Sequence, residues 1–79
     1  MKTVYNITES SNISLVVANS EKRNLIITFK NGKRYKYESV TKFDYEAFIG
    51  DITQGNSVGK SFAKYIRPKY AGKKLEEES

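Results

Sequence analysis

The sequence predicts an α+β domain, in which a three-stranded antiparallel meander is followed by two short helices packed on one face of the sheet. Short apolar and β-branched runs in the first half of the chain are typical of strands. Asn31-Gly32, between two of these runs, is the strongest short-range signal of a hairpin. In the second half, apolar residues recur at the spacing of a helix face. With 79 residues, 38% of them hydrophobic, the chain can form one core but not two.

Three runs are predicted to be strands, at residues 13–18, 25–29 and 33–37. The loop between the last two decides which of their side chains share a face of the sheet. A two-residue turn would place the charged side chains of the third strand on the apolar face of the second, where they would be buried. A three-residue loop over 30–32, with its glycine in the left-handed region, avoids this and is the loop we predict.

With that loop, the two tyrosines of the third strand lie opposite apolar residues of the second. Tyr35 pairs with Ile27, and Tyr37 pairs with Leu25. Two roles stay open for these tyrosines, because exposed aromatic rings on a sheet can also stack on RNA bases. A domain this small needs its large apolar groups for the core, which favours the buried role.

The first helix is predicted to begin at Thr41, because Asp44 three residues later completes a capping-box pattern. Gly50 inside this helix costs about 1 kcal/mol relative to alanine and weakens its last turn. A second helix is predicted to run from a cap at Ser57 to about Arg67, since Pro68 prevents its continuation. The apolar stripe of the first helix is formed by Tyr45, Phe48, Ile49 and Ile52, and that of the second by Phe62, Tyr65 and Ile66.

The domain is expected to span residues 10–72, preceded by an N-terminal extension at 1–9. The tail at 73–79 has opposite charge runs and no periodicity, so we expect it to be flexible. No apolar segment follows the first residues, and no apolar run is long enough to cross a membrane. We therefore expect a cytoplasmic protein.

Several functions are excluded by composition. The chain contains neither cysteine nor histidine, which excludes disulfides, structural zinc sites and nucleophiles that need a histidine base. Asp44, Glu46 and Asp51 are expected on the solvent side of the first helix, where they cannot face one another across a cleft. Gly59-Lys60-Ser61 lacks the earlier glycine of a P-loop at the required spacing. We expect no enzyme activity, no cofactor and no metal.

The charge of the chain points to a polyanionic partner. Fourteen lysines and arginines stand against nine acidic residues, a net charge of +5. Lys60, Lys64 and Arg67 follow one another at i, i+4 and i+7 and predict a basic stripe on the second helix. The candidate nucleic-acid-binding residues are Lys60, Lys64, Arg67, Arg34, Lys36 and Tyr70. Tyr70, just after the proline, has two open roles: stacking on a base, or fastening the tail to the sheet.

Several segments of the chain resemble one known family. They are Ser10-Ser11-Asn12-Ile13, Leu25-Ile26-Ile27-Thr28-Phe29, Gly32, Tyr35-Lys36-Tyr37, Val40, and Ser57-Val58-Gly59-Lys60-Ser61-Phe62 through Ile66-Arg67 to Tyr70. In these residues the chain resembles the KTSC domain, which occurs at the C-terminus of some lysyl-tRNA synthetases and alone in small bacterial and phage proteins. The resemblance covers roughly residues 10–72. Thr41 departs from it, because the family commonly has proline there.

The family that the chain resembles has no assigned activity, and RNA binding is the usual conjecture for it. The positions that it marks are Tyr35, Tyr37, Gly59, Lys60, Phe62 and Arg67. We therefore expect a small non-catalytic module that binds nucleic acid, most simply RNA, through phosphate contacts from the basic stripe. The alternative is a protein-interaction module, such as a phage accessory protein that binds and inhibits or redirects a host protein. A third hypothesis is a dimer, in which two chains pair through an open edge of the sheet at 13–18 or 33–37.

Overall fold

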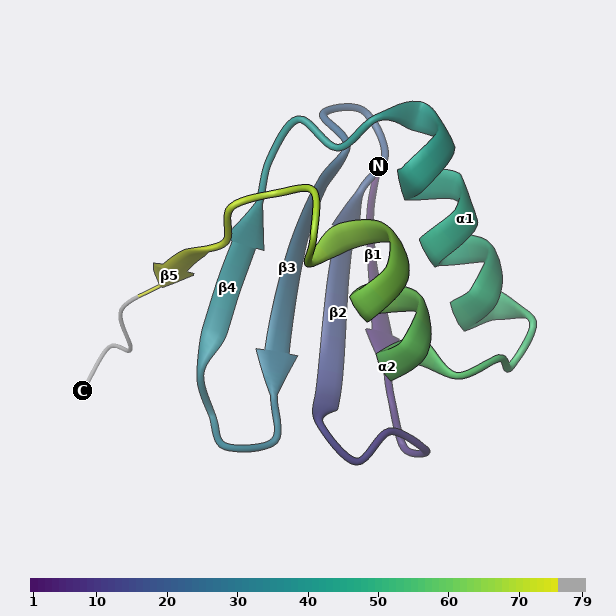
Figure 1. Cartoon of the computed structure of the whole chain (residues 1–79), viewed down its shortest axis with the longest axis vertical. Helices are drawn as coiled ribbons and strands as arrows, with labels where there is room; N and C mark the ends of the chain where they lie inside the picture. The colour runs from purple at the N-terminus through teal and green to yellow at the C-terminus, as the bar shows by residue number, and fades with distance from the viewer. Residues whose placement is uncertain (76–79) are drawn as a thin grey trace.

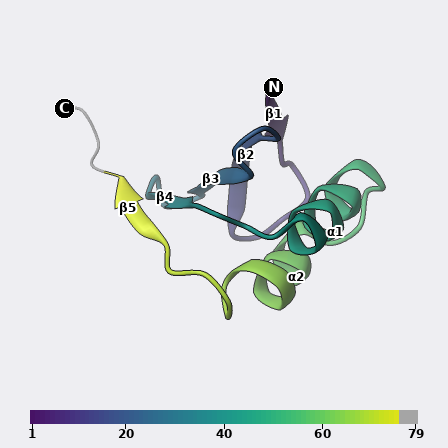
Figure 2. The same cartoon turned by 90° about the horizontal axis from the view of Figure 1, so that it is seen from above.

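Five antiparallel strands form one sheet in the computed structural model, which describes residues 1–75, and helices cover one face of that sheet (Figure 1, Figure 2). The order of the strands in the sheet follows their order in the chain. The elements are β1 (Lys2–Asn6), β2 (Ile13–Asn19), β3 (Asn24–Phe29), β4 (Arg34–Tyr37), α1 (Lys42–Thr53), α2 (Val58–Ser61), the π-helical segment η1 (Phe62–Ile66) and β5 (Lys73–Leu75).

The α+β class is confirmed, and the three predicted strands correspond to β2, β3 and β4. The predicted hairpin register is also confirmed, because Tyr35 lies opposite Ile27 and Tyr37 lies opposite Leu25. Gly32 closes the loop in the left-handed region, with a φ of 89°. Its N–H donates to the carbonyl oxygen of Phe29 over 2.9 Å.

The sheet has two strands more than the sequence predicts. Strand β1 lies in the expected N-terminal extension and pairs with β2 along its whole length. Strand β5 lies in the tail that was expected to be flexible and pairs with β4; residues 76–79 of that tail lie outside the described residues. The dimer hypothesis placed open edges at β2 and β4, but both are inner strands. Neither addition has a strong local signal, since β5 has only three residues and β1 has no continuous apolar face.

The predicted helix caps are confirmed. The hydroxyl oxygen of Thr41 accepts from the N–H of Asp44, and that of Ser57 accepts from the N–H of Lys60. The second predicted helix has its expected extent, but only its first turn is α-helical. From Phe62 onward it is a π-helix, in which the N–H of Arg67 donates to the carbonyl oxygen of Phe62 over 2.9 Å. No helix among residues 1–75 is long and apolar enough to cross a membrane.

The core lies between the helices and the sheet face that they cover. Its fully buried side chains are Phe48, Ile13, Leu25, Ile27, Ile66, Val16, Val40 and Val58. Side chains alternate between the two faces of a strand, so the neighbours of these residues in β2 and β3 point to the opposite, uncovered face. Arg34 and Lys36, which flank Tyr35 in β4, are on that uncovered face.

Candidate nucleic-acid interface

A groove of about 690 Å³ opens on the helix-covered side of the molecule. It lies between the loop end of the β3–β4 hairpin, the segment that leads into β2, and the helical stretch of α2 and η1. Its lining residues are Ser11, Asn12, Ile13, Phe29, Lys30, Asn31, Lys33, Tyr35, Tyr37, Gly59, Phe62, Ala63 and Arg67. The lining contains no aspartate or glutamate, so the charged side chains of the groove are all positive.

Aromatic rings form the floor of the groove. The ring of Phe29 meets the rings of Tyr35 and Phe62 edge to face, at centroid distances of 5.8 and 5.7 Å. Tyr37 meets Phe62 in the same way at 5.5 Å. Tyr37 is 6% exposed and belongs to the core, whereas Tyr35 is half-buried and keeps part of its ring at the surface. Tyr37 therefore has the buried role that the sequence favours, whereas the ring of Tyr35 is partly exposed.

The ring of Tyr37 lies between the ring of Phe62 and the backbone of Gly72. The backbone of Gly72 approaches its ring so closely that a Cβ at this position would lie 2.7 Å from Cζ and 2.8 Å from the hydroxyl oxygen. Burial is the main cause that raises the pKa of Tyr37, and the neighbouring Tyr35 adds to it. The positive charge of Arg67 acts in the opposite direction. Tyr37 therefore stays neutral beneath the groove, and Gly72 lets the chain pass over its ring toward β5.

Three positively charged side chains line the groove: Lys30, Lys33 and Arg67. Arg67 was a predicted site residue, but Lys30 and Lys33 were not, although they belong to a basic cluster visible in the sequence. Lys74 of β5 lies opposite Tyr35 in the sheet register, so it is on the helix-covered face beside this ring. Lys30 and Lys33 precede Arg67 and Lys74 by more than 30 residues in the chain, and only the tertiary structure brings the two groups together.

The π-helical turn explains why Arg67 lies in the groove. Its backbone hydrogen bond joins residues five positions apart, so Arg67 is stacked one turn after Phe62, a groove residue, rather than above Lys64. The other two members of the predicted basic stripe, Lys60 and Lys64, are exposed and do not line the groove. The amino group of Lys64 lies 5.1 Å from the centre of the Tyr65 ring. The stripe is therefore divided between the groove and the outer surface of the helix.

The remaining predicted residues lie elsewhere. Arg34 and Lys36 are on the uncovered sheet face, and the amino group of Lys36 is 3.8 Å from a carboxylate oxygen of Glu38. Glu38 also pairs with Lys73 at 3.0 Å, and this hydrogen-bonded lysine is the main reason why the pKa of Glu38 is lowered. The structure thus does not join Arg34 and Lys36 with Arg67 in one site.

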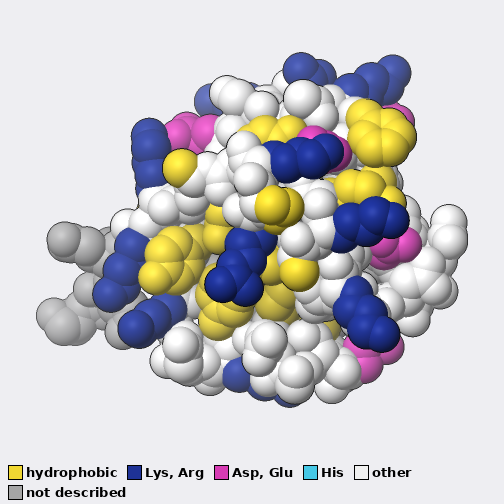
Figure 3. All heavy atoms as spheres, in the orientation of Figure 1, with side chains coloured by type: hydrophobic (Ala, Val, Ile, Leu, Met, Phe, Trp, Pro, Cys, Tyr) yellow, Lys and Arg dark blue, Asp and Glu magenta, His cyan; other side chains and the backbone are white. Residues whose placement is uncertain are grey.

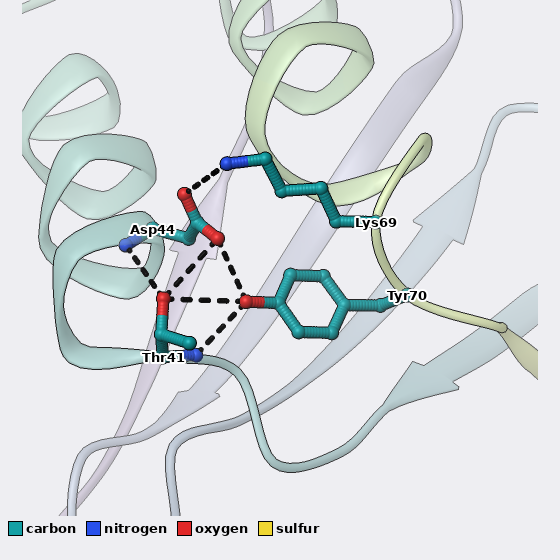
Figure 4. Close-up of polar contacts among 4 residues, drawn as sticks. All are labelled: Thr41, Asp44, Lys69 and Tyr70. Atoms are coloured by element: carbon teal, nitrogen blue, oxygen red, sulfur yellow. Dashed lines mark hydrogen bonds and ion pairs between the residues drawn. The ribbon is translucent and has the colours of Figure 1, made fainter.

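Tyr70 bonds to the start of α1, whereas the roles expected from the sequence were stacking on a base or attachment of the tail to the sheet. Its hydroxyl group donates to Oδ2 of Asp44 over 2.7 Å and accepts from the N–H of Thr41 over 3.0 Å (Figure 4). The tyrosine therefore fastens the segment after η1 to the start of α1, not to the sheet. Its hydroxyl group is engaged inside the protein and its ring is half-buried.

Asp44 corrects a second expectation. It is 3% exposed and lies between α1 and the segment after η1, not on the solvent side of α1. The hydrogen bond from Tyr70 lowers the pKa of Asp44, and Lys69 at 3.1 Å and Thr41 act in the same direction against the effect of burial.

No cluster of three possible metal-ligating side chains occurs among residues 1–75.

Comparison with known proteins yields one family and one fold. The model of the KTSC domain family matches residues 9–70. Among solved structures, the crystal structure of a KTSC domain protein from Yersinia pestis is similar, with a TM-score of 0.75 and 22% sequence identity. The match covers 96% of this chain and 100% of the Yersinia chain. At that identity the likeness concerns the fold. No curated protein matches this sequence.

Proposed function

This chain belongs to the KTSC domain family, and we propose that it is a small non-catalytic module that binds single-stranded RNA in the aromatic groove. The observation that carries the proposal is the composition of this groove: an aromatic floor, three cations and no carboxylate in its lining. The family resemblance supports the same place. Of the six positions that it marks, five line the groove: Tyr35, Tyr37, Gly59, Phe62 and Arg67. Such a module would act in the cytoplasm.

The groove offers what an unpaired nucleotide needs. The exposed part of the Tyr35 ring can stack on one base, and stacking of this kind is worth about 1–3 kcal/mol per base with little preference among bases. Arg67, Lys30 and Lys33 surround the rings and can contact the phosphates on either side of that base. Bases in a duplex are stacked on one another and unavailable to a protein ring, so the proposal names a single strand.

Two double charge reversals test the proposal, because cations on opposite faces can be changed in matched pairs. The groove variant carries Lys33→Glu and Arg67→Glu. The sheet variant carries Arg34→Glu and Lys36→Glu on the uncovered face, and it changes the net charge by the same amount. We measure the dissociation constant of a fluorescently labelled mixed-sequence RNA by anisotropy at about 50 mM salt, where phosphate contacts are strong.

We expect the groove variant to bind at least about ten-fold more weakly than the wild type, because it places repulsive charge at two phosphate contacts. We expect the sheet variant to stay within about three-fold of the wild type. Circular dichroism establishes that both variants are folded. Equal losses in the two variants would show that RNA responds only to net charge, which contradicts a groove site. Absence of binding by the wild type at low salt would overturn the proposal in favour of a protein partner for the groove.

A further inference from the structure

Phe43 is the most exposed aromatic residue in the described part of the chain. It lies in the first turn of α1 and is 71% exposed, although a phenylalanine contributes to stability mainly when it is buried. It is not isolated, because its ring meets that of Tyr65 edge to face at a centroid distance of 6.3 Å. The two rings form a small aromatic surface between α1 and η1, which we call the outer platform. Its members are Phe43 and Tyr65.

A lysine lies beside the outer platform. The amino group of Lys64 lies 5.1 Å from the centre of the Tyr65 ring, and Lys42 of α1 and Lys60 of α2 are also exposed. The carboxylate of Asp44, next to Phe43 in the chain, is already paired with Lys69 and Tyr70. Glu46 is the exposed carboxylate of the following turn, and Asp51, further along α1, lies close enough to Lys64 for the charge of this lysine to help lower the pKa of Asp51. Lys64 is therefore the cation that the structure places beside these rings, where it can meet a phosphate.

The outer platform and the groove are the two sides of one helical segment. Within η1 and the residue after it, Phe62, Ala63 and Arg67 line the groove, whereas Lys64 and Tyr65 belong to the outer side. Seen from the helix-covered side, two areas of hydrophobic side chains have lysines and arginines between them and around them (Figure 3). A strand that leaves the groove across η1 therefore meets Lys64 and then a second exposed aromatic surface.

We propose that the outer platform is a second base-stacking subsite, which takes a later nucleotide of the same single strand while Lys64 contacts its phosphate. This inference rests on the proposed function of the groove and extends it to a strand of several nucleotides that crosses η1. The short dimensions of the molecule are 26 and 25 Å, so a strand that reaches both sites stays within the range of about 4–16 nucleotides typical of single-strand-binding domains.

The test compares two lengths of oligouridylate, about three and about ten nucleotides, of which only the longer can reach both sites. Phe43→Ala should leave the affinity for the short probe unchanged and weaken the long probe by about ten-fold, the equivalent of one lost stacking contact. Val4→Ala is the matched control, because Val4 is 55% exposed and lies on the uncovered sheet face. It should leave both affinities unchanged.

Phe43→Trp keeps an aromatic ring and adds a reporter, since the chain contains no tryptophan. We expect this variant to bind the long probe as the wild type does, and we expect the long probe, but not the short one, to quench its fluorescence. Normal binding of the long probe by Phe43→Ala, or no quenching in Phe43→Trp, would overturn the outer platform while leaving the groove in place. If neither probe binds the wild type, the proposed function itself is wrong.

Discussion

Asp44 is the residue at which this structure departs most from the local pattern of the sequence. As the third residue of α1 it accepts hydrogen bonds from the hydroxyl groups of Thr41 and Tyr70 and from the amino group of Lys69. The first of these partners is local, and its capping role was predicted from the spacing. The other two arrive from 25 and 26 residues further along the chain, and they turn a helix-start carboxylate into a buried clasp between two segments.

This clasp makes stability depend on pH in a defined direction. The pKa of Asp44 is below its ordinary value of 3.8 in the folded protein, so the unfolded chain takes up this proton more readily. The contribution of Asp44 is therefore complete above about pH 4 to 5 and is lost as the pH falls below its ordinary pKa. We expect Asp44→Asn to lower the melting temperature at neutral pH and to approach the wild type in acid. Thermal unfolding followed by circular dichroism between pH 7 and pH 2 measures this difference.

Glu46→Gln is the control, because it removes an exposed carboxylate of the same helix that has no partner like Tyr70. Its melting temperature should follow that of the wild type across the same range. A constant difference between Asp44→Asn and the wild type at every pH would contradict the clasp, because it would mean that the charge of Asp44 contributes nothing to the fold.

At the scale of elements, β1 is the strand whose existence depends on its neighbour. Its residues are nearly all exposed, and its only long contact in the sheet is with β2. The N–H of Ile7 donates to the carbonyl oxygen of Ser14, and the N–H of Ser20 donates to that of Met1. In an antiparallel ladder bonded residues alternate, so the N–H of Thr3 points toward β2 and the N–H of Val4 points to the open edge.

Proline substitutions test this arrangement, since proline removes a backbone donor. Thr3→Pro deletes a hydrogen bond inside the β1–β2 ladder, whereas Val4→Pro removes an N–H that only solvent can reach. Both side chains are exposed, which makes the two variants a matched pair. We expect Thr3→Pro to be less stable than Val4→Pro by about 1–3 kcal/mol, measured by urea unfolding. Equal stabilities would mean that β1 is not paired in solution as the structure has it.

In the molecule as a whole, lysines and arginines lie on both faces of the sheet, and only some of them line the groove. The net charge is +5, whereas three cations line the groove. Binding of a polyanion to the entire surface and binding in the groove therefore differ in the number of phosphates neutralised. That number is measurable, because the salt dependence of affinity reports it.

We expect the short oligouridylate, made with a 5′-phosphate so that its three nucleotides carry three phosphate groups, to show a slope of log affinity against log salt concentration of about −2, from about 0.7 per phosphate contact on a single strand and three groove cations. Its affinity should then fall about twenty-fold between about 50 and about 200 mM salt. Anisotropy titrations at four salt concentrations give this slope. A value near zero would show that phosphates are not contacted, and a much steeper value would show that binding is spread over the surface.

Local patterns were enough for the features that depend on neighbouring residues. Asn31-Gly32 and the alternation on either side of it predict the hairpin and the register of Tyr35 and Tyr37. The Thr41 and Ser57 caps follow from side chains that bond the backbone three residues later. Arg67 was found as a candidate from charge and spacing alone.

The tertiary structure decided where those features meet. The groove exists because Lys30 and Lys33 of the hairpin, the rings of β3 and β4 and Arg67 converge from separate segments, and the π-turn after Phe62 directs Arg67 there rather than along the stripe with Lys60 and Lys64. The burial of Asp44 and the addition of β5 are of the same kind. Contacts between distant segments produce no periodic pattern in the sequence, because the local pattern of each segment reflects only its own secondary structure. The free energy of packing is gained only when the segments meet in the folded protein.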